Sequence, residues 1–412
     1  MGLGPTDPIQ GVSHHAAIQA CAQASIQATT QVPVQALRAC LPVRLPRPGP
    51  GMTSLRIFAG SRALERLRSE GFVADSFSWL AGASGGPKWF VLHGIDRYLA
   101  SSFFHDRQTP LHMIGSSAGA WRLACFAQRN PVIALETLAK FYSQQTYSQN
   151  PDAQEISREA RAMLSAVMGA QGAADVAGNA VMRLHVIADR ARGLLRSDRR
   201  LPLSLGLAAS AAGNLLSRRA LACFFERHIF HNSHDGAQTL PLSDLPSQYV
   251  ALTPENVPDA LMASGSIPFI MESVQNVSGT KPGSVFRDGG ITDYHLDLPF
   301  QQSEGLVLYP HFYAGVTPGW FDRFVPWRKA HGDHFDNVVL LSPSREFVAS
   351  LPYGKIPDRN DFKHLDAVER LRYWQRVLQE SERLADDFRA LVEKGRGLEK
   401  IQVFQSQRIK HA

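Results

Sequence analysis

The chain has 412 residues, of which 44% are hydrophobic and 19% are charged, and it carries a net charge of +6 at pH 7. These fractions are those of a globular protein with a sizeable core. The positive charge is mild and no basic run is interleaved with aromatic residues, so the sequence argues against a nucleic-acid partner and leaves an anionic lipid surface as a candidate. The four cysteines have neither metal nor disulfide spacing, which favours a reducing compartment and a cytoplasmic location.

The first 51 residues differ from the rest in composition. They are rich in Gln, Ala, Ser, Thr and Pro, and their only acidic residue is Asp7. Such a stretch buries too little apolar surface to offset its chain entropy, so residues 1–51 are expected to be a disordered or mis-started extension and not a secretion signal. Sequence of globular texture begins at Met52, and residues 52–412 are expected to form one domain.

Predicted helices and strands alternate along this domain. The first are a helix at 61–72, a strand at 76–81, a helix at 88–103, a strand at 111–116 and a helix at 118–128. The order of strand, glycine-rich turn and helix occurs twice. It predicts an α/β fold whose parallel sheet is flanked by helices. Residues 134–231 are expected to be almost entirely helical. The later elements are strands at 248–252, 284–287, 305–310 and 337–343, and one long helix over 361–394.

No stretch of the sequence is typical of a membrane-spanning helix. The longest uncharged run of residues 52–412, residues 201–217, is too short and too rich in Ser, Gly and Ala. It is expected to be either a core helix or an apolar flap at a lipid-binding mouth. The arginine-rich stretch before it, residues 183–200, either contacts anionic lipid or forms a solvated helix face.

The pattern G-x-S-x-G occurs twice. GASGG, residues 82–86, places Ser84 between two glycines, and GSSAG, residues 115–119, does the same for Ser117. This pattern is typical of a nucleophilic serine on a tight turn between a strand and a helix, where only glycine leaves room for the backbone. One active site needs one such serine, so the two matches have different roles.

A third motif lies near residue 290. VFRDGGITDYHLDLP, residues 285–299, puts Asp288 before two glycines at the end of a predicted strand, and ALMASGSIPFI, residues 260–270, comes shortly before it. Glycines let a loop bring a carboxylate against another backbone turn without a side-chain clash. Taken alone, D-G-G is most often only a turn. Asp293, five residues on, competes with Asp288 as the active carboxylate, or it anchors the loop that follows.

Together these segments resemble the patatin-like phospholipases. In that family a glycine-rich oxyanion loop precedes a G-x-S-x-G turn, an A-S-x-S-I-P-like stretch and a D-G-G or D-G-A motif. This chain has GASGGPKW, GSSAGA, MASGSIPF and DGGITDYHLDLP in the same order, over most of residues 76–300. The resemblance implies a three-layer α/β/α fold, a Ser–Asp dyad without histidine, and calcium-independent hydrolysis of lipid acyl esters with no cofactor and no metal.

The order of the motifs assigns the two serines. Ser117 takes the nucleophile position, supported by Gly115 and Gly119, and Asp288 takes the position of the base. The Ser84 stretch takes the position of the oxyanion loop, in which Gly85 and Gly86 supply N–H groups. Pro87 suits a rigid loop because it fixes its own φ.

Two residues after this loop are candidates for binding substrate. Lys88, at the family's basic position, either orients a phosphate or is a surface lysine. Trp89 replaces the family's last loop glycine, and it either fills space against the sheet or lines the acyl channel. Ser84 itself stands where the family has a glycine, and the family's leading Asp is absent.

Asp288 would accept the Ser117 proton during attack on the ester, which gives an acyl-enzyme. An unperturbed Asp has a pKa of about 4 and is a weak base at neutral pH, so burial is expected to raise its pKa. The protein is expected in the cytoplasm, at the periphery of an anionic membrane.

Two other functions compete with this one. The first is an α/β-hydrolase esterase that uses Ser117, Asp288 and a later histidine, His295 or His331. The second is a catalytically silent lipid-binding protein. Two histidine-rich stretches could be drawn as metal sites but match no ligand template, so they are interpreted as polar loop ends. Their residues are His228, His231, His234 and Asp235, and His331, Asp333, His334 and Asp336.

Overall fold

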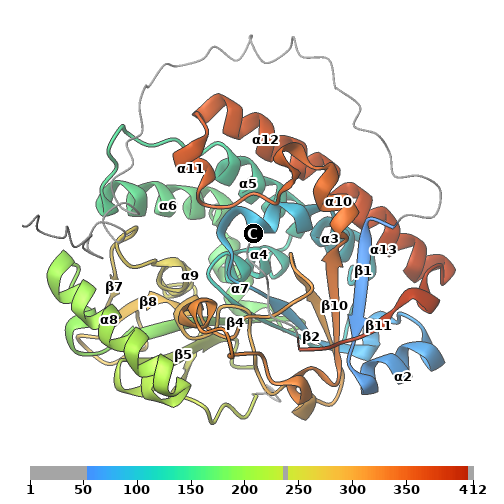
Figure 1. Ribbon diagram of the computed structural model, residues 1–412, viewed down its shortest axis with the longest axis horizontal. Helices are drawn as coiled ribbons and strands as arrows, with labels where there is room; N and C mark the ends of the chain where they lie inside the picture. The colour runs from blue at the N-terminus through green and yellow to red at the C-terminus, as the bar shows by residue number, and fades with distance from the viewer. Residues whose placement is uncertain (1–52, 235–239, 407–412) are drawn as a thin grey trace, which may run out of the picture.

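A computed structural model describes residues 53–234 and 240–406. The expectation for residues 1–51 and the residue Asp235 lie outside this range. The described chain contains a mixed sheet of eleven strands (Figure 1). These are β1 Leu55–Ala59, β2 Phe77–Gly82, β3 Leu111–Ser116, β4 Met182–Ala191, β5 Phe225–His231, β6 Ser247–Ala251, β7 Val274–Gln275, β8 Val285–Asp288, β9 Leu306–Pro310, β10 Val338–Pro343 and β11 Gln402–Val403.

The middle of the sheet is parallel. Strands follow one another in the order β11-β1-β10-β9-β2-β3-β4-β5-β6, and β10, β9, β2, β3 and β4 all run in the same direction. Every residue of β3, β9 and β10 is buried, as expected for strands covered on both faces. β1 is antiparallel to β10 at one side, and β5 is antiparallel to β4 at the other.

Helices flank this sheet and give the three-layer α/β/α arrangement (Figure 1). α4 packs on β2, β3 and β4, while α5, α6 and α12 gather at the top of the view. The helices are α2 Ser61–Glu70, α3 His93–Tyr98, α4 Ala118–Phe126, α5 Pro131–Ser143, α6 Ala153–Met168, α7 Gly172–Gly178, α8 Arg200–Leu216, α9 Val257–Gly265, α10 Arg345–Ser350, α11 Asp361–His364, α12 Ala367–Glu380 and α13 Glu382–Lys394. None of these helices has the length and apolar character needed to cross a bilayer.

The mainly helical prediction for residues 134–231 is wrong over β4 and β5, in which all of β5 pairs with residues 185–191 of β4. Both strands contain charged residues that make their patterns resemble an amphipathic helix. In the fold these charges are neutralised by partners, as where Arg190 donates to Glu226 across the pair at 2.5 Å. Half of the arginine-rich stretch 183–200 is therefore strand, residues 183–191, and its interpretation as a helix face is also wrong.

The long C-terminal helix predicted over 361–394 is divided into α11, α12 and α13. α12 has its own N-cap, because the Asp366 carboxylate accepts the N–H groups of Val368 and Glu369. Ser381 separates α12 from α13, and its hydroxyl oxygen accepts the N–H of Gly94 at 2.9 Å. The helix predicted over 88–103 is likewise irregular, since only His93–Tyr98 within it is α-helical.

The run 201–217 forms α8, which is not a core helix. Leu203 is buried, but Leu201 and Leu216 are 71% and 88% exposed. The apolar face of α8 is thus shared between a small core beneath the helix and the surface.

Strand register brings three predicted motifs to one place. Gly82, at the end of β2, lies beside Gly115 of β3, so the loop after β2 adjoins the turn after β3. β8 runs antiparallel to β4 and ends where β3 ends: Ser116 is opposite Ile187, and Asp288 is opposite Ala188. The ends of β3 and β8 therefore meet over two consecutive residues of β4.

Candidate active site

Ser117 lies on the turn between β3 and α4. Its backbone has φ 53° and ψ −130°, a conformation that L-residues rarely adopt and that is held here by packing on both sides. A Cβ on Gly119 would lie 2.0 Å from the carbonyl oxygen of Gly82, and one on Gly115 would lie 2.8 Å from the Ala120 nitrogen. Both flanking glycines are thus required for the turn to sit this close to β2 and α4.

The Ser117 hydroxyl donates to the Asp288 carboxylate at 2.8 Å. The other carboxylate oxygen accepts the N–H of Gly290 at 2.7 Å, which fixes the plane of the carboxyl group. Both side chains are nearly buried, with Ser117 8% and Asp288 6% exposed. The predicted serine and carboxylate are therefore in direct contact at hydrogen-bonding distance.

Burial raises the pKa of Asp288 to about 6. The hydrogen bonds from Ser117 and Gly290 and the positive charge of Arg359 act in the opposite direction, because they stabilise the charged form. Asp288 is thus a stronger base than an exposed carboxylate and is still mostly ionised at neutral pH.

The backbone of Ser117 has an anchor that sequence reasoning missed. Its N–H donates to the Ser264 hydroxyl at 2.8 Å, and that hydroxyl donates to the carbonyl of Ile187 at 2.6 Å. Ser264 thereby ties the nucleophile turn to β4. It belongs to the MASGSIPF stretch, whose place among the motifs was the only signal for it.

Gly85 and Gly86 lie beside Ser117 and line the same cavity. Gly86 has φ 56°, which favours glycine, and a Cβ on Gly85 would lie 2.5 Å from the Phe312 ring. Their amides donate no hydrogen bond to any residue that the structure describes. Together with the N-terminus of α4 at Ala118, they present N–H groups to the space next to the serine.

Ser84, the alternative nucleophile, lies behind this loop and is 2% exposed. Its hydroxyl is 2.7 Å from that of Ser116, which donates to the carbonyl oxygen of Asp293. Its N–H donates to the carbonyl of Tyr294 at 2.9 Å. Ser84 thus joins two strand ends, and no carboxylate within residues 53–234 and 240–406 pairs with it.

The two candidate substrate-binding residues have different surroundings. Lys88 lines the cavity, and burial lowers its pKa to about 8. Trp89 is 1% exposed, is not among the residues that line the cavity, and packs against Phe90 and Tyr142. Of the two sequence alternatives for Trp89, the structure favours the filling of space.

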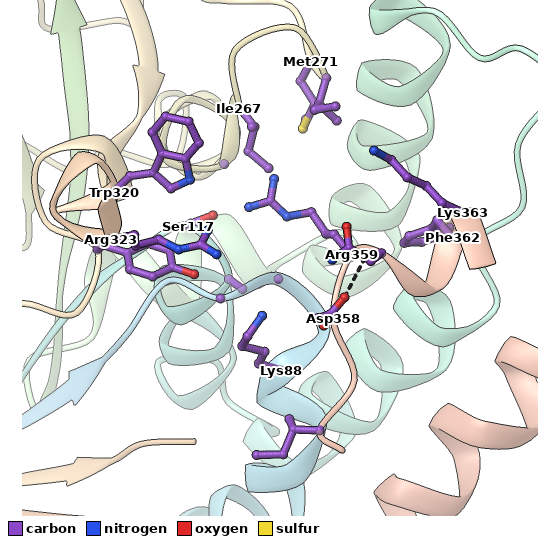
Figure 2. A pocket seen from close by; sticks show the side chains of 18 of the residues that line it. Lys88, Ser117, Ile267, Met271, Trp320, Arg323, Asp358, Arg359, Phe362 and Lys363 are labelled. Carbon is purple, nitrogen blue, oxygen red and sulfur yellow. Dashed lines mark hydrogen bonds between the residues drawn. The ribbon is translucent and has the colours of Figure 1, made fainter. Parts of the chain in front are cut away.

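Ser117 opens into a cavity of about 2000 Å³ (Figure 2). Part of its wall is apolar, and Figure 2 shows Ile267, Met271 and Trp320 on that side. The rest carries basic groups from several segments of the chain. The basic residues are Arg56, Lys88, Arg200, Arg323, Arg345, Lys355, Arg359 and Lys363, and the acidic ones are Asp152, Asp198 and Asp358.

Asp293, the competing carboxylate, belongs to a buried ion-pair network. Both of its oxygens accept from Arg227, at 2.6 and 2.8 Å, and both residues are 0% exposed. Thr292 also donates to it at 2.7 Å. Asp293 therefore holds the loop after Asp288 and does not face Ser117.

Neither Ser117 nor Asp288 has a histidine partner in the part of the chain that the structure describes. The Nδ1 of His295 accepts the N–H of Thr317, 3.1 Å away, and His331 pairs with Asp297. The geometry of a Ser–Asp–His triad is thus not formed by either histidine named for it.

One described group has side chains spaced as metal ligands would be. His331 and His334 each place Nδ1 2.8 Å from a different oxygen of Asp297. None of the three lines the cavity around Ser117. In the first histidine stretch, His231 is bonded instead to the backbone carbonyl of Asn232.

Comparison with known families gives a match for most of this site. A family model described as patatin-like phospholipase matches residues 62–295, more than half of the chain. A comparison with curated proteins found no match. The matched region contains the loop after β2, the serine turn and the carboxylate, but it ends before Arg323 and Arg359.

Proposed function

Because the chain belongs to the patatin-like phospholipase family, we propose that it hydrolyses fatty-acyl esters of lipids through Ser117 and Asp288. The observation that carries this proposal is the 2.8 Å hydrogen bond from the Ser117 hydroxyl to a buried carboxylate at the wall of a partly apolar cavity. A serine on a tight turn, a base in contact with it and unpaired amides beside it are the parts that acyl transfer requires.

In the first half of the reaction, Ser117 Oγ attacks the ester carbonyl while Asp288 takes its proton. The N–H groups of Gly85 and Gly86 stabilise the resulting oxyanion, an effect worth about 10²- to 10³-fold in rate per donor. The carboxyl group of Asp288 then gives the proton to the departing alkoxide, and the acyl group remains on Ser117.

In the second half, a water molecule takes the place of the alcohol. Asp288 removes its proton as the water oxygen attacks the acyl-enzyme, and the proton returns to Ser117 Oγ as the fatty acid leaves. One carboxyl group therefore serves as base and acid in turn, and no proton is gained or lost over the cycle. No step requires a metal, so hydrolysis is expected to proceed at an unchanged rate in EDTA.

The mouth of the cavity suits a lipid surface. Leu201 and Leu205 of α8 and Phe269 all line the cavity, yet they are 71%, 54% and 39% exposed. Arg200 lies next to them and also faces the cavity. Apolar side chains beside a cation favour contact with an anionic membrane surface, from which a lipid chain would enter.

The test compares two serine variants on a fatty-acyl ester. Ser117→Ala is expected to abolish hydrolysis, because no attacking oxygen remains. Ser84→Ala, which removes a hydroxyl from the other G-x-S-x-G motif, is expected to retain a substantial fraction of the rate. Full activity of Ser117→Ala would refute the proposed function.

A further inference from the structure

We propose that Arg359, together with Lys88, binds a negatively charged phosphodiester of the substrate and so makes the enzyme selective for phospholipids over uncharged acylglycerols. This inference rests on the proposed function and deepens it. Arg359 lies beyond the region that the family model matches, so the proposed role belongs to this chain's own C-terminal segment.

Arg359 lies directly over the loop that carries the proposed oxyanion-binding amides. A Cβ on Gly86 would be 3.4 Å from its Cγ and 3.5 Å from its Nε. Its positive charge also lowers the pKa of Asp288, which places the guanidinium within electrostatic reach of the dyad. Figure 2 shows Arg359 and Lys88 entering the cavity from different segments, near Ser117.

Neither cation has a protein partner in the described ranges. No hydrogen bond and no ion pair reaches the guanidinium of Arg359 or the Nζ of Lys88, although both line the cavity. The acidic residue beside them is Asp358, and its carboxylate already accepts the N–H of Asn360 at 2.7 Å. Two cations facing one cavity without a paired anion leave their N–H donors available to an anionic ligand.

The electrostatics of Lys88 point the same way. Burial is the main cause that lowers its pKa to about 8, and the charges of Arg359 and Arg323 lower it further, while Asp358 raises it. Among these charges Asp358 has the largest effect, and Arg359 and Arg323 oppose it. A phosphodiester bound between Lys88 and Arg359 would relieve the repulsion between the two cations.

The segment that carries Arg359 is held in place. The buried carboxylate of Asp361 accepts the N–H of Asp358 and the indole N–H of Trp374, both at 2.9 Å, and it also pairs with Lys355 at 2.5 Å. Asp361 and Trp374 are both 0% exposed. Because the backbone around Arg359 is held in place, anion binding has to immobilise only the side chain and not the loop.

The chemistry of a phospholipid matches this placement. Its phosphodiester is separated from the acyl ester only by the glycerol unit, so both groups bind close together. With the ester carbonyl at Gly85 and Gly86, the phosphate would lie beside the adjoining Arg359. A diacylglycerol with the same acyl chains offers no anion there.

The experiment measures kcat and KM on 1,2-dihexanoyl phosphatidylglycerol and on 1,2-dihexanoylglycerol for the wild-type chain and Arg359→Gln. Loss of a charged hydrogen bond is expected to lower kcat/KM on the phospholipid by about 10- to 100-fold, mainly through KM. At pH 8, where Asp288 stays ionised without the charge of Arg359, the value for the uncharged ester should change by less than about threefold. Arg372→Gln, an exposed arginine of α12 outside the cavity, is the matched control and should leave both esters unchanged.

Inorganic phosphate separates a substrate subsite from a site for a free anion. It is expected to compete with the phospholipid on the wild-type chain and to lose this effect in Arg359→Gln. If Arg359→Gln weakens phosphate inhibition but slows both esters equally, the site serves a free anion and the substrate role is overturned. If Arg359→Gln matches the wild-type chain in its kcat/KM on both esters and in its inhibition by phosphate, Arg359 binds no anion. Both failures leave Ser117→Ala inactive, whereas an active Ser117→Ala would overturn the proposed function itself.

Discussion

Asp288 has to be buried enough to be a useful base and charged enough to act as one. We expect Asp288→Asn to keep the fold, because the amide retains the size of the carboxyl group: its oxygen can still accept from Gly290, and its NH2 group can donate to Ser117 Oγ. Turnover should fall by about 10²- to 10⁴-fold, which is the usual contribution of a general base. Hydrolysis of a fatty-acyl ester and the melting temperature, measured on the same samples, check both expectations.

The matched control is Asp293→Asn, five residues along the same loop. Arg227 would then be a buried guanidinium without its full counter-charge, a loss that costs about 3–5 kcal/mol of stability in comparable pairs. This variant should therefore melt at a clearly lower temperature while its surviving folded fraction still hydrolyses ester. If Asp293→Asn is as stable as the wild-type chain and Asp288→Asn is fully active, Asp288 is not the base and Asp293 does not stabilise the loop.

The raised pKa of Asp288 has a consequence for stability as well as for rate. Its pKa of about 6 lies above the value of 3.8 for an exposed Asp, so the folded state holds this proton more tightly than the unfolded state. Asp288 therefore destabilises the fold progressively as pH rises from about 4 to 6, and the full cost remains above pH 6.

The raised pKa of Asp288 leads to two measurable expectations, one for the rate and one for the stability. Ester hydrolysis should rise with pH along a limb centred near pH 6, as Asp288 loses its proton. Asp288→Asn should melt above the wild-type chain at pH 8, and this gain should vanish at pH 4. A variant less stable than wild type at pH 8 would show that the buried carboxylate is not a net cost.

At the scale of elements, α8 is the helix whose exposed leucines need an explanation. We expect Leu201→Glu to slow hydrolysis in anionic vesicles severalfold or more, since a carboxylate at the mouth is repelled by the lipid and resists burial in it. Hydrolysis of a short, monomeric ester should be almost unchanged. The measurement is the ratio of the two rates.

The control for α8 lies on the same helix. Leu216 is even more exposed, at 88%, but it does not line the cavity and lies roughly 22 Å along the helix from Leu201. Leu216→Glu should change the ratio far less. An equal effect of both substitutions would mean that the membrane does not meet the protein at the cavity mouth.

At the scale of the whole molecule, local sequence predicted the turns of the site better than the contacts between segments that are distant along the chain. Ser117 and Asp288 stand in short motifs whose glycines are needed for close backbone approach, so their contact follows from local signals and strand order. The parallel strands β2, β3, β9 and β10 were also predicted, because buried parallel strands are short apolar runs.

What the sequence did not reveal depends on partners distant along the chain. β4 and β5 carry charges whose partners lie on the neighbouring strand. The pattern of one segment alone does not reveal such a partner, so these charges were interpreted as the solvated face of a helix. Arg359 has no motif around it, and it reaches the site only because α11 and α12 anchor its loop. Its position depends on tertiary packing around Asp361, which no local pattern records.

The proposed function depends above all on Ser117 being the residue that becomes acylated. The most direct measurement is to label the wild-type chain with a long-chain fluorophosphonate and to map the modified residue by peptide mass spectrometry. The label is expected on Ser117 alone, and it should be absent from both Ser117→Ala and chains inactivated at Asp288. A label on Ser84, or unchanged labelling of Ser117→Ala, would contradict the assignment and with it the proposed dyad.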